Sequence, residues 1–131
     1  VADNMRVKNR FVFFHGLKSP QEIVEFMQTA DFFAMNSNFE TFSVATAEAI
    51  ACGVPVIVTR CGGPEDFVTE DVGILIERAN EKQLEEAIFY MLDNWRKYSK
   101  KKLQEHAKSK FSYEVVGRKF YEIYKSAVRK S

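Results

Sequence analysis

Two glutamates, Glu40 and Glu48, stand eight residues apart with the start of a predicted helix between them. Ser43 is a residue type that caps helices and Gly53 one that ends them, which predicts a helix over residues 44–52. The spacing corresponds to two helical turns plus about 80°, so both carboxylates can face one side, about 12 Å apart. The helix N-terminus offers unpaired N–H groups to an anion. Hydroxyl-binding carboxylates beside a phosphate-binding helix end suit a sugar joined to a nucleotide through a diphosphate.

The predicted helix is apolar on nearly every side and consists mostly of small residues, which indicates that it is buried. Glu48 lies in its middle, and a buried carboxylate costs several kcal/mol unless a partner hydrogen-bonds it. The residue types alone favour a simpler alternative, in which Glu48 pairs with an arginine or lysine and Glu40 is solvated.

Strands and helices alternate along the chain. β-Forming runs predict four strands, the first of them buried, at Phe11–Phe14, Asp31–Met35, Pro55–Thr59 and Val72–Ile76. This alternation predicts an α/β fold, a Rossmann-like parallel sheet with helices on both faces. Such sheets bind ligands beyond the carboxyl ends of their strands, where His15 and residues 36–43 and 60–65 lie.

Helix boundaries are marked by capping residues. Ser19, Pro20 and Glu22 together predict a helix start. Further helices are predicted from a capping box of Asn80 and Gln83, over the polar stretch 94–108, and over 112–130 with Ser112 as cap. The loop 60–66 carries glycines that permit either a backbone nest for an anion or a plain tight turn.

Bulk properties narrow the class of protein. The 131 residues fit one domain, with 1–10 as a polar leader, and the formal charge of +1 gives no electrostatic case for nucleic acid. Cys52 and Cys61 make neither a disulfide framework nor a metal site and are better explained as small buried hydrophobes. No secretory signal or membrane-length apolar run is present, so a cytoplasmic setting is expected. The first residue is Val and the opening is polar, which suggests a piece of a longer chain.

The stretch around the two glutamates resembles the E-x7-E signature of the retaining glycosyltransferases of the GT-B fold, family 4. The run SNFETFSVATAEAIACGVPVIVTRCGGPE follows that family's E-x-F-x5-E-A-x-A-x-G-x-P-V-I pattern and the later G-G-x-x-E. The matching residues are Glu40, Phe42, Glu48, Ala49, Ala51, Gly53, Pro55, Val56, Ile57, Gly62, Gly63 and Glu65. The resemblance covers most of the chain but only part of the family's length, which implies a partial C-terminal, donor-binding domain.

The resemblance implies roles for particular residues. Glu48 would hold the ribose hydroxyls of a UDP- or GDP-hexose donor, and Glu40 would contact the donor sugar near the reacting centre as the catalytic residue. The backbone N–H groups of Thr41, Phe42, Ser43 and Val44 would bind the diphosphate or sugar. His15 and Gly16 would touch the base. No metal or cofactor is implied.

Two departures from the family pattern affect these expectations. Thr41 and Ser43 stand where the family often has glycine, which leaves the donor sugar open. No residue matches the family's basic pair, which neutralises the donor diphosphate. We therefore expect little or no transferase activity from this piece alone, because stabilising the leaving diphosphate is the main catalytic effect.

The implied partners lie mostly outside this chain. The acceptor, a glycan, lipid or small molecule, would bind a missing N-terminal domain, and the longer protein could associate peripherally with a membrane. Two missing strands would leave the first strand without its neighbour, so a strand-swapped oligomer is one alternative. A non-catalytic nucleotide-binding or interaction module is the second functional hypothesis. A dinucleotide-binding oxidoreductase is disfavoured because no G-x-G-x-x-G follows a predicted strand.

Overall fold

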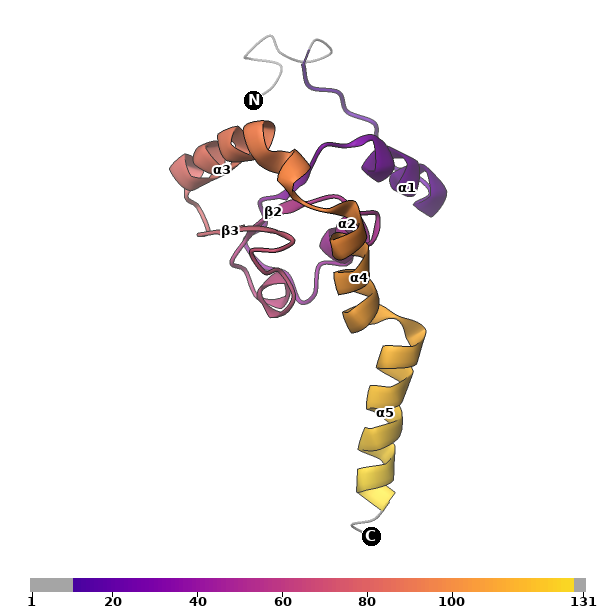
Figure 1. Cartoon of the computed structure of the whole chain (residues 1–131). Coiled ribbons are helices and arrows are strands. Elements are labelled where there is room, and N and C mark those ends of the chain that lie inside the picture. Colours follow the sequence, from indigo (N-terminus) through magenta and orange to yellow (C-terminus); the bar gives the residue numbers. More distant parts are fainter. Residues whose placement is uncertain (1–10, 129–131) are drawn as a thin grey trace.

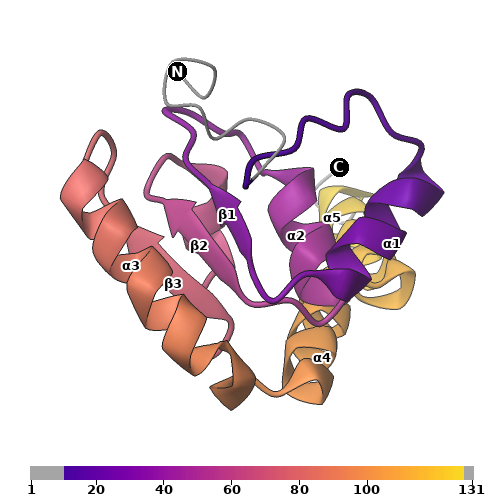
Figure 2. The same cartoon turned by 90° about the horizontal axis from the view of Figure 1, so that it is seen from above.

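The computed structural model describes residues 11–128, in which three parallel strands lie between helices (Figures 1 and 2). Two short 3₁₀ helices, η1 and η2, interrupt the sequence of regular elements. The elements in chain order are α1 (Pro20–Thr29), β1 (Phe33–Met35), α2 (Val44–Ala51), β2 (Val56–Thr59), η1 (Gly63–Asp66), β3 (Gly73–Ile76), α3 (Glu81–Asn94), η2 (Trp95–Lys97), α4 (Lys100–Phe111) and α5 (Tyr113–Val128).

The strands follow the order β1-β2-β3, with β2 in the centre and fully buried. Ile57 of β2 lies opposite Ala34 of β1 and Ile74 of β3, so all three strands share one register. The α/β fold class and the parallel sheet with flanking helices are therefore confirmed. Because the strands are parallel, their carboxyl ends meet at one edge, as the predicted binding site requires.

Alternate residues of β2 supply the cores on the two faces of the sheet. Val56 and Val58 pack in a cluster with residues of α2 and α4, including Ile50 and Leu103. Ile57 points to the other face and packs with Met91 of α3. Figure 2 shows α2 and α4 on one side of the sheet and α3 on the other. The core therefore fixes α2, and with it Glu48, relative to the carboxyl ends of the strands.

Two helix boundaries form as the sequence predicts. The Ser19 hydroxyl accepts the Glu22 N–H, and the Glu22 carboxylate accepts the Ser19 N–H at 2.9 Å, which completes the capping box at α1. Gly53 follows the end of α2 with a φ of 81°, a conformation that glycine adopts without a steric cost.

The prediction of a buried strand at Phe11–Phe14 is wrong. These side chains are exposed, and the run lies outside the three-stranded sheet. Val12 takes part in a single-residue bridge, but the run does not join the sheet, in which β1 pairs with β2. Completion of the sheet by a second chain stays a prediction.

Two further helix predictions need correction. The stretch 94–108 is not one helix, because η2 ends at Lys97 and α4 begins after Ser99, whose hydroxyl caps it. The predicted capping box at Asn80 is half formed. The Asn80 side chain accepts the Gln83 N–H, but the Gln83 side chain accepts the N–H of Glu77 instead.

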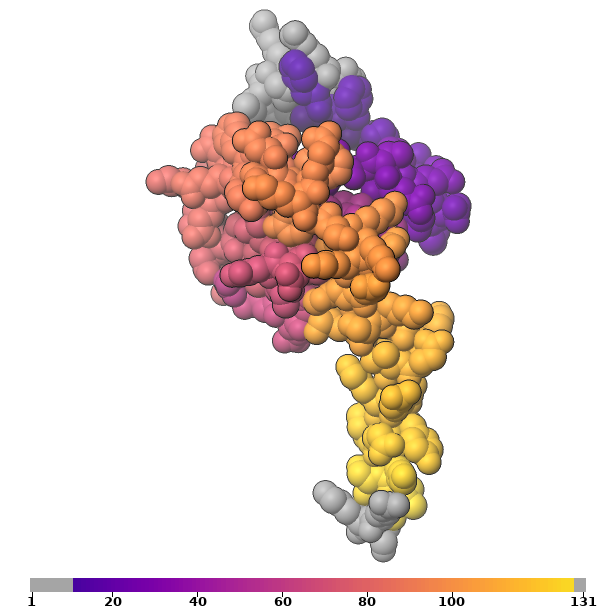
Figure 3. Space-filling view, viewed as in Figure 1, coloured from indigo at the N-terminus to yellow at the C-terminus, as the bar shows by residue number. Residues whose placement is uncertain are grey.

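Helix α5 extends away from the sheet (Figures 1 and 3). Ser112 caps it as predicted, by accepting the N–H of Val115 at 3.3 Å. Its apolar residues are largely exposed, including Phe120 and Ile123. No helix within residues 11–128 is both long and apolar enough to cross a membrane. The predicted polar leader, 1–10, and the last residues of the predicted C-terminal helix lie outside the described residues.

Candidate functional site

The loop that follows β1, residues 36–43, is called here the Glu40 loop. It runs beside the glycines that follow β2. The Glu40 N–H donates to the Cys61 carbonyl at 3.0 Å, and the Gly63 N–H donates to the Glu40 carbonyl at 2.9 Å. A Cβ on Gly62 would lie 2.6 Å from the Glu40 carbonyl oxygen, and one on Gly63 would overlap the backbone of Thr41 and Phe42. The two glycines therefore permit the close approach of these loops at the carboxyl ends of the strands.

The Glu40 side chain is half-buried at this edge. One of its carboxylate oxygens accepts a hydrogen bond from the Ser37 hydroxyl at 2.9 Å. The loop is also tied to β2, because the buried Thr59 hydroxyl donates to the Ser37 carbonyl at 2.6 Å. Glu40 is thus held by its hydrogen bond from Ser37, which Thr59 in turn anchors to β2, and is not freely solvated.

Replacing Thr59 with valine should lower the free energy of unfolding by about 1–2 kcal/mol, because the Ser37 carbonyl loses its buried donor while the side-chain volume is kept. Urea unfolding of the purified chain measures this. Thr29→Val is the matched control, since the Thr29 hydroxyl bonds only the nearby Phe26 carbonyl at an exposed helix end. Equal losses in the two variants would contradict a special role for the buried bond.

Glu48 is exposed, so the prediction that its helix is buried on nearly every side is wrong. Helix α2 buries Thr46, Ala47, Ala49 and Ile50 against the sheet and α4, and its opposite side is open. Among the described residues, no lysine or arginine lies within ion-pair distance of Glu48. Within this part of the chain, the alternative that Glu48 pairs with an arginine or lysine is therefore also wrong. Burial raises the pKa of the Cys52 thiol, and the nearby Glu48 carboxylate raises it further. The Glu48 side chain is therefore accessible to solvent and to a ligand.

Ser43 occupies the capping position of α2 but does not cap it. Its φ of 67° is unusual for a residue with a Cβ, and its side chain makes no capping hydrogen bond. The hydroxyl instead contacts the Met35 sulfur and the Thr46 hydroxyl, each at 2.8 Å. The N–H groups of the first turn of α2 consequently lack a side-chain cap from Ser43, which leaves them for other acceptors.

Cys61 is buried as predicted, whereas Cys52 is half-buried, and both are free thiols. No cluster of three potential metal-ligating side chains occurs in the part of the chain that the structure describes.

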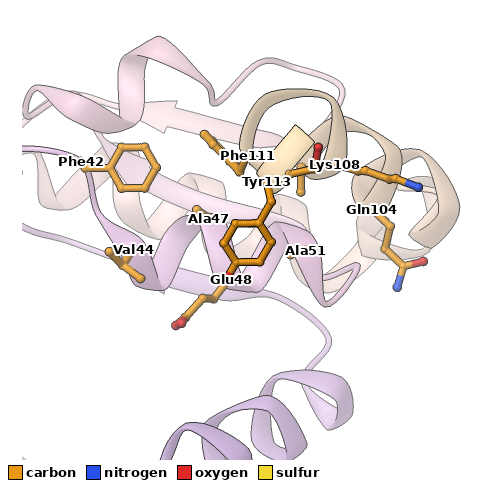
Figure 4. A pocket seen from close by; sticks show the side chains of 11 residues that line it. Phe42, Val44, Ala47, Glu48, Ala51, Gln104, Lys108, Phe111 and Tyr113 are labelled. Carbon is orange, nitrogen blue, oxygen red and sulfur yellow. The ribbon is translucent and has the colours of Figure 1, made fainter. Parts of the chain in front are cut away.

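Three of the predicted site residues line a groove between α2 and the α4–α5 junction (Figure 4). The groove has a volume of about 670 Å³. Phe42 and Val44 lie toward one end of it, and Gln104 and Lys108 lie toward the other. Glu48 is the carboxylate among its lining residues, whereas Glu40 does not line it. Glu40 therefore lies at the strand ends outside this groove, and Glu48 lies on α2 within it.

His15 and Gly16 lie beside α1. The His15 ring packs against Phe26 of α1 with its centroid 4.5 Å from that of Phe26 and the planes tilted by 50°, and Gly16 has a φ of 66°. None of the contacts found among the described residues joins His15 to the Glu40 loop. The structure thus brings Phe42, Val44 and Glu48 together in one groove, leaves Glu40 outside it at the strand ends, and packs His15 on α1.

Two arginines lie at this edge, Arg60 within the predicted range 60–65 and Arg78 outside it. Arg78 follows β3 by two residues, and its guanidinium donates to the Asn38 carbonyl at 3.4 Å. Arg60 follows β2 and forms ion pairs with Glu65 at 3.8 Å and Glu77 at 3.1 Å. Glu65 also accepts the Gly62 N–H, which shapes the glycine loop. Their positions within two residues of a strand's carboxyl end are the sequence signal that could identify them.

Known glycosyltransferases are similar in sequence to this chain. A family model described as glycosyl transferases group 1 matches residues 2–110. An uncharacterised glycosyltransferase of Methanocaldococcus jannaschii is 36% identical, over 92% of this chain and 36% of its own length. A D-inositol 3-phosphate glycosyltransferase of Corynebacterium urealyticum is 32% identical, over 90% of this chain and 28% of its own. The chain thus spans about a third of the relatives it matches.

Solved structures of GT-B glycosyltransferases share the fold. A sucrose-phosphate synthase from Thermosynechococcus elongatus superposes with a TM-score of 0.85 at 23% identity, over 99% of this chain and 33% of that one. The Anabaena protein HepE, solved in complex with UDP-glucose, superposes with a TM-score of 0.81 at 25% identity, over 95% of this chain and 35% of that one. With the extent of the family match, these findings establish that the chain belongs to the glycosyl transferases group 1 family.

Proposed function

We propose that this chain is the C-terminal, donor-binding part of a retaining glycosyltransferase of family 4, which transfers a hexose from a nucleotide donor to an acceptor. The observation that carries the proposal is the pairing of the Glu40 loop with Gly62 and Gly63 beside the uncapped start of α2. The uncapped N–H groups at the start of α2 and the Glu40 carboxylate are the kinds of groups that bind a phosphate and a sugar hydroxyl. The similarity to a structure solved with UDP-glucose supports a nucleotide-sugar donor.

Each side chain then has a distinct role in holding the donor. The exposed Glu48 carboxylate accepts hydrogen bonds from the ribose hydroxyls. Glu40, held by Ser37, contacts the donor sugar and stabilises positive charge that develops at the reacting carbon. The N–H groups of residues 41–44 bind the diphosphate. His15 and Gly16 contact the base once their segment moves from its position beside α1.

We further propose that the 131-residue chain alone transfers little or no sugar. The leaving diphosphate needs positive charge, and the Arg60 guanidinium is already engaged by two carboxylates. Acceptor binding would require the rest of a longer protein. A radiolabelled donor assay on the purified chain tests this, and measurable transfer to any acceptor would contradict it.

Thermal unfolding in the presence of nucleotide sugars tests donor binding. A ligand that binds only the native state stabilises it by about 2.7 kcal/mol at 100 times its Kd, which raises the Tm. We expect a UDP- or GDP-hexose to raise the Tm more than the same concentration of free hexose, and NAD to have no effect. A panel in which no nucleotide sugar raises the Tm would argue against the proposal.

The engagement of Arg60 also favours a second candidate, a non-catalytic nucleotide-binding module on the same scaffold. The two candidates differ in the behaviour of a longer protein that contains this domain. Sugar transfer that is lost on Glu40→Ala supports the enzyme. Donor binding without transfer or donor hydrolysis supports the module.

A further inference from the structure

Three phenylalanine rings from separate parts of the chain pack against one another behind the Glu40 loop. Phe42 of the loop lies 5.3 Å from both Phe67 and Phe111, measured between ring centroids. The Phe67 and Phe111 rings are 5.2 Å apart and nearly perpendicular. We call this set the aromatic cluster. Perpendicular contacts of this kind are favourable because the positive ring edge meets the negative ring face.

Two members of the cluster are fixed by the fold. Phe67 is 2% exposed, and its carbonyl oxygen lies 2.7 Å from the His106 Nε2 of α4. Phe111 is the last residue of α4, which packs on α2 through the buried Leu103 and Ala107. Phe42 is the exception, with 40% of its surface exposed. Phe67 and Phe111 therefore form a wall, and Phe42 is the side chain that attaches the loop to it.

The Glu40 loop needs such an attachment. Ser43, directly after Phe42, holds a positive φ that a residue with a Cβ adopts only when its surroundings impose it. Backbone hydrogen bonds to Cys61 and Gly63 fix the loop at Glu40, three residues earlier. Between these points, the Phe42 ring is the large apolar side chain that contacts the core.

We propose that Phe67 and Phe111 are positioning residues, which act through Phe42 to hold the Glu40 loop and the start of α2 in their observed geometry. The use of that geometry for donor binding rests on the proposed function, whereas the holding itself does not. Neither ring lies in the Glu40 loop or belongs to the predicted donor contacts. Phe67 does not line the groove beside Glu48, so its effect on a ligand is indirect. Phe111 does line that groove (Figure 4), so its positioning role is tested by hydrogen exchange without a ligand.

Hydrogen exchange of single amides, followed by NMR, tests the holding without a ligand. In Phe111→Leu, the Gly63 and Glu40 N–H groups should exchange roughly threefold to tenfold faster, the factor that corresponds to one aromatic pair. The Phe33 N–H, which donates to the Pro55 carbonyl between β1 and β2, is the reference in the same sample. Unchanged ratios of the Gly63 and Glu40 rates to the Phe33 rate would overturn the proposal.

Met91→Ala is the matched control variant, because Met91 is fully buried in the core on the other face of the sheet. It should accelerate exchange of the Phe33 N–H at least as much as that of the loop amides. If Phe111→Leu fails to fold, Phe42→Leu removes the shared Phe42–Phe111 contact from a partly exposed position. It should produce the same selective acceleration, and its failure to do so would equally overturn the proposal.

A double-mutant cycle then separates positioning from the proposed function. Phe42→Leu and Phe111→Leu should affect loop exchange non-additively, because each removes the same contact, whereas Phe42→Leu and Met91→Ala should add. In calorimetric titrations with UDP-glucose, each cluster variant should weaken binding and Met91→Ala should not. The wild-type chain could fail to bind UDP-glucose while Phe42→Leu and Phe111→Leu still affect exchange of the loop amides non-additively. In that case the positioning role stands and the proposed donor fails. Normal binding by the variants together with additive exchange would overturn the positioning role alone.

Discussion

Gly63→Ala should lower the free energy of unfolding by about 1–3 kcal/mol and abolish donor binding. The new Cβ would overlap the backbone of Thr41 and Phe42, and backbone atoms cannot move aside as the end of a flexible side chain can. Relief of the overlap requires the Glu40 loop to separate from the glycine loop. This breaks the hydrogen bond from the Gly63 N–H to the Glu40 carbonyl. Urea unfolding and calorimetric titration with UDP-glucose measure the two effects.

Gly117→Ala is the matched control for this substitution. Gly117 lies within α5, and a Cβ built on it meets nothing within 4 Å. Alanine is a better helix former than glycine by about 1 kcal/mol, so this variant should keep or slightly raise stability and should bind donor normally. If Gly63→Ala behaved like Gly117→Ala, the close approach of the two loops would have no energetic importance.

Glu48→Gln should weaken donor binding about tenfold, with little change in stability. A hydrogen bond to a charged group contributes about 1.5–3 kcal/mol, and glutamine keeps the shape of the side chain but loses the charge. Stability should be retained because Glu48 is exposed and makes no ion pair among the described residues. Titration calorimetry with a nucleotide sugar measures the affinity.

Glu86→Gln is the control for Glu48→Gln, since Glu86 is an exposed glutamate on α3 that pairs only with Lys82 on the same helix. Binding should be unaffected by this change. An equal loss of affinity in both variants would contradict a direct contact to Glu48, because removing a negative charge does not by itself weaken binding of an anionic donor.

Local rules were sufficient to predict much of the fold. The capping box at Ser19, the end of α2 at Gly53 and the three strands of the sheet depend on neighbours in sequence, and each is present. The run Phe11–Phe14 has equally strong β-forming residues, but a strand also needs a pairing partner, which its own residues cannot specify. Prediction therefore failed where the outcome depended on a distant segment.

Some features of the candidate site could likewise be predicted from local sequence, and others could not. The position of Glu40 at the strand ends followed from the alternation of elements, and the structure places it there. The exposure of Glu48 could not be predicted, because composition made α2 look uniformly apolar and only the packing of Thr46 and Ile50 decides which side is covered. The aromatic cluster joins three distant positions through Phe67 and Phe111, a contact that no local spacing encodes.

The central claim is that the Glu40 loop and the first turn of α2 hold a nucleotide sugar. An amide NMR titration of the isotope-labelled chain with UDP-glucose and GDP-mannose tests it most directly. The account predicts saturable shifts of the amides at Thr41–Val44, Glu48 and Gly62–Gly63, with α3 unaffected. Saturable shifts confined to other elements, or none at the Glu40 loop with either donor, would contradict it.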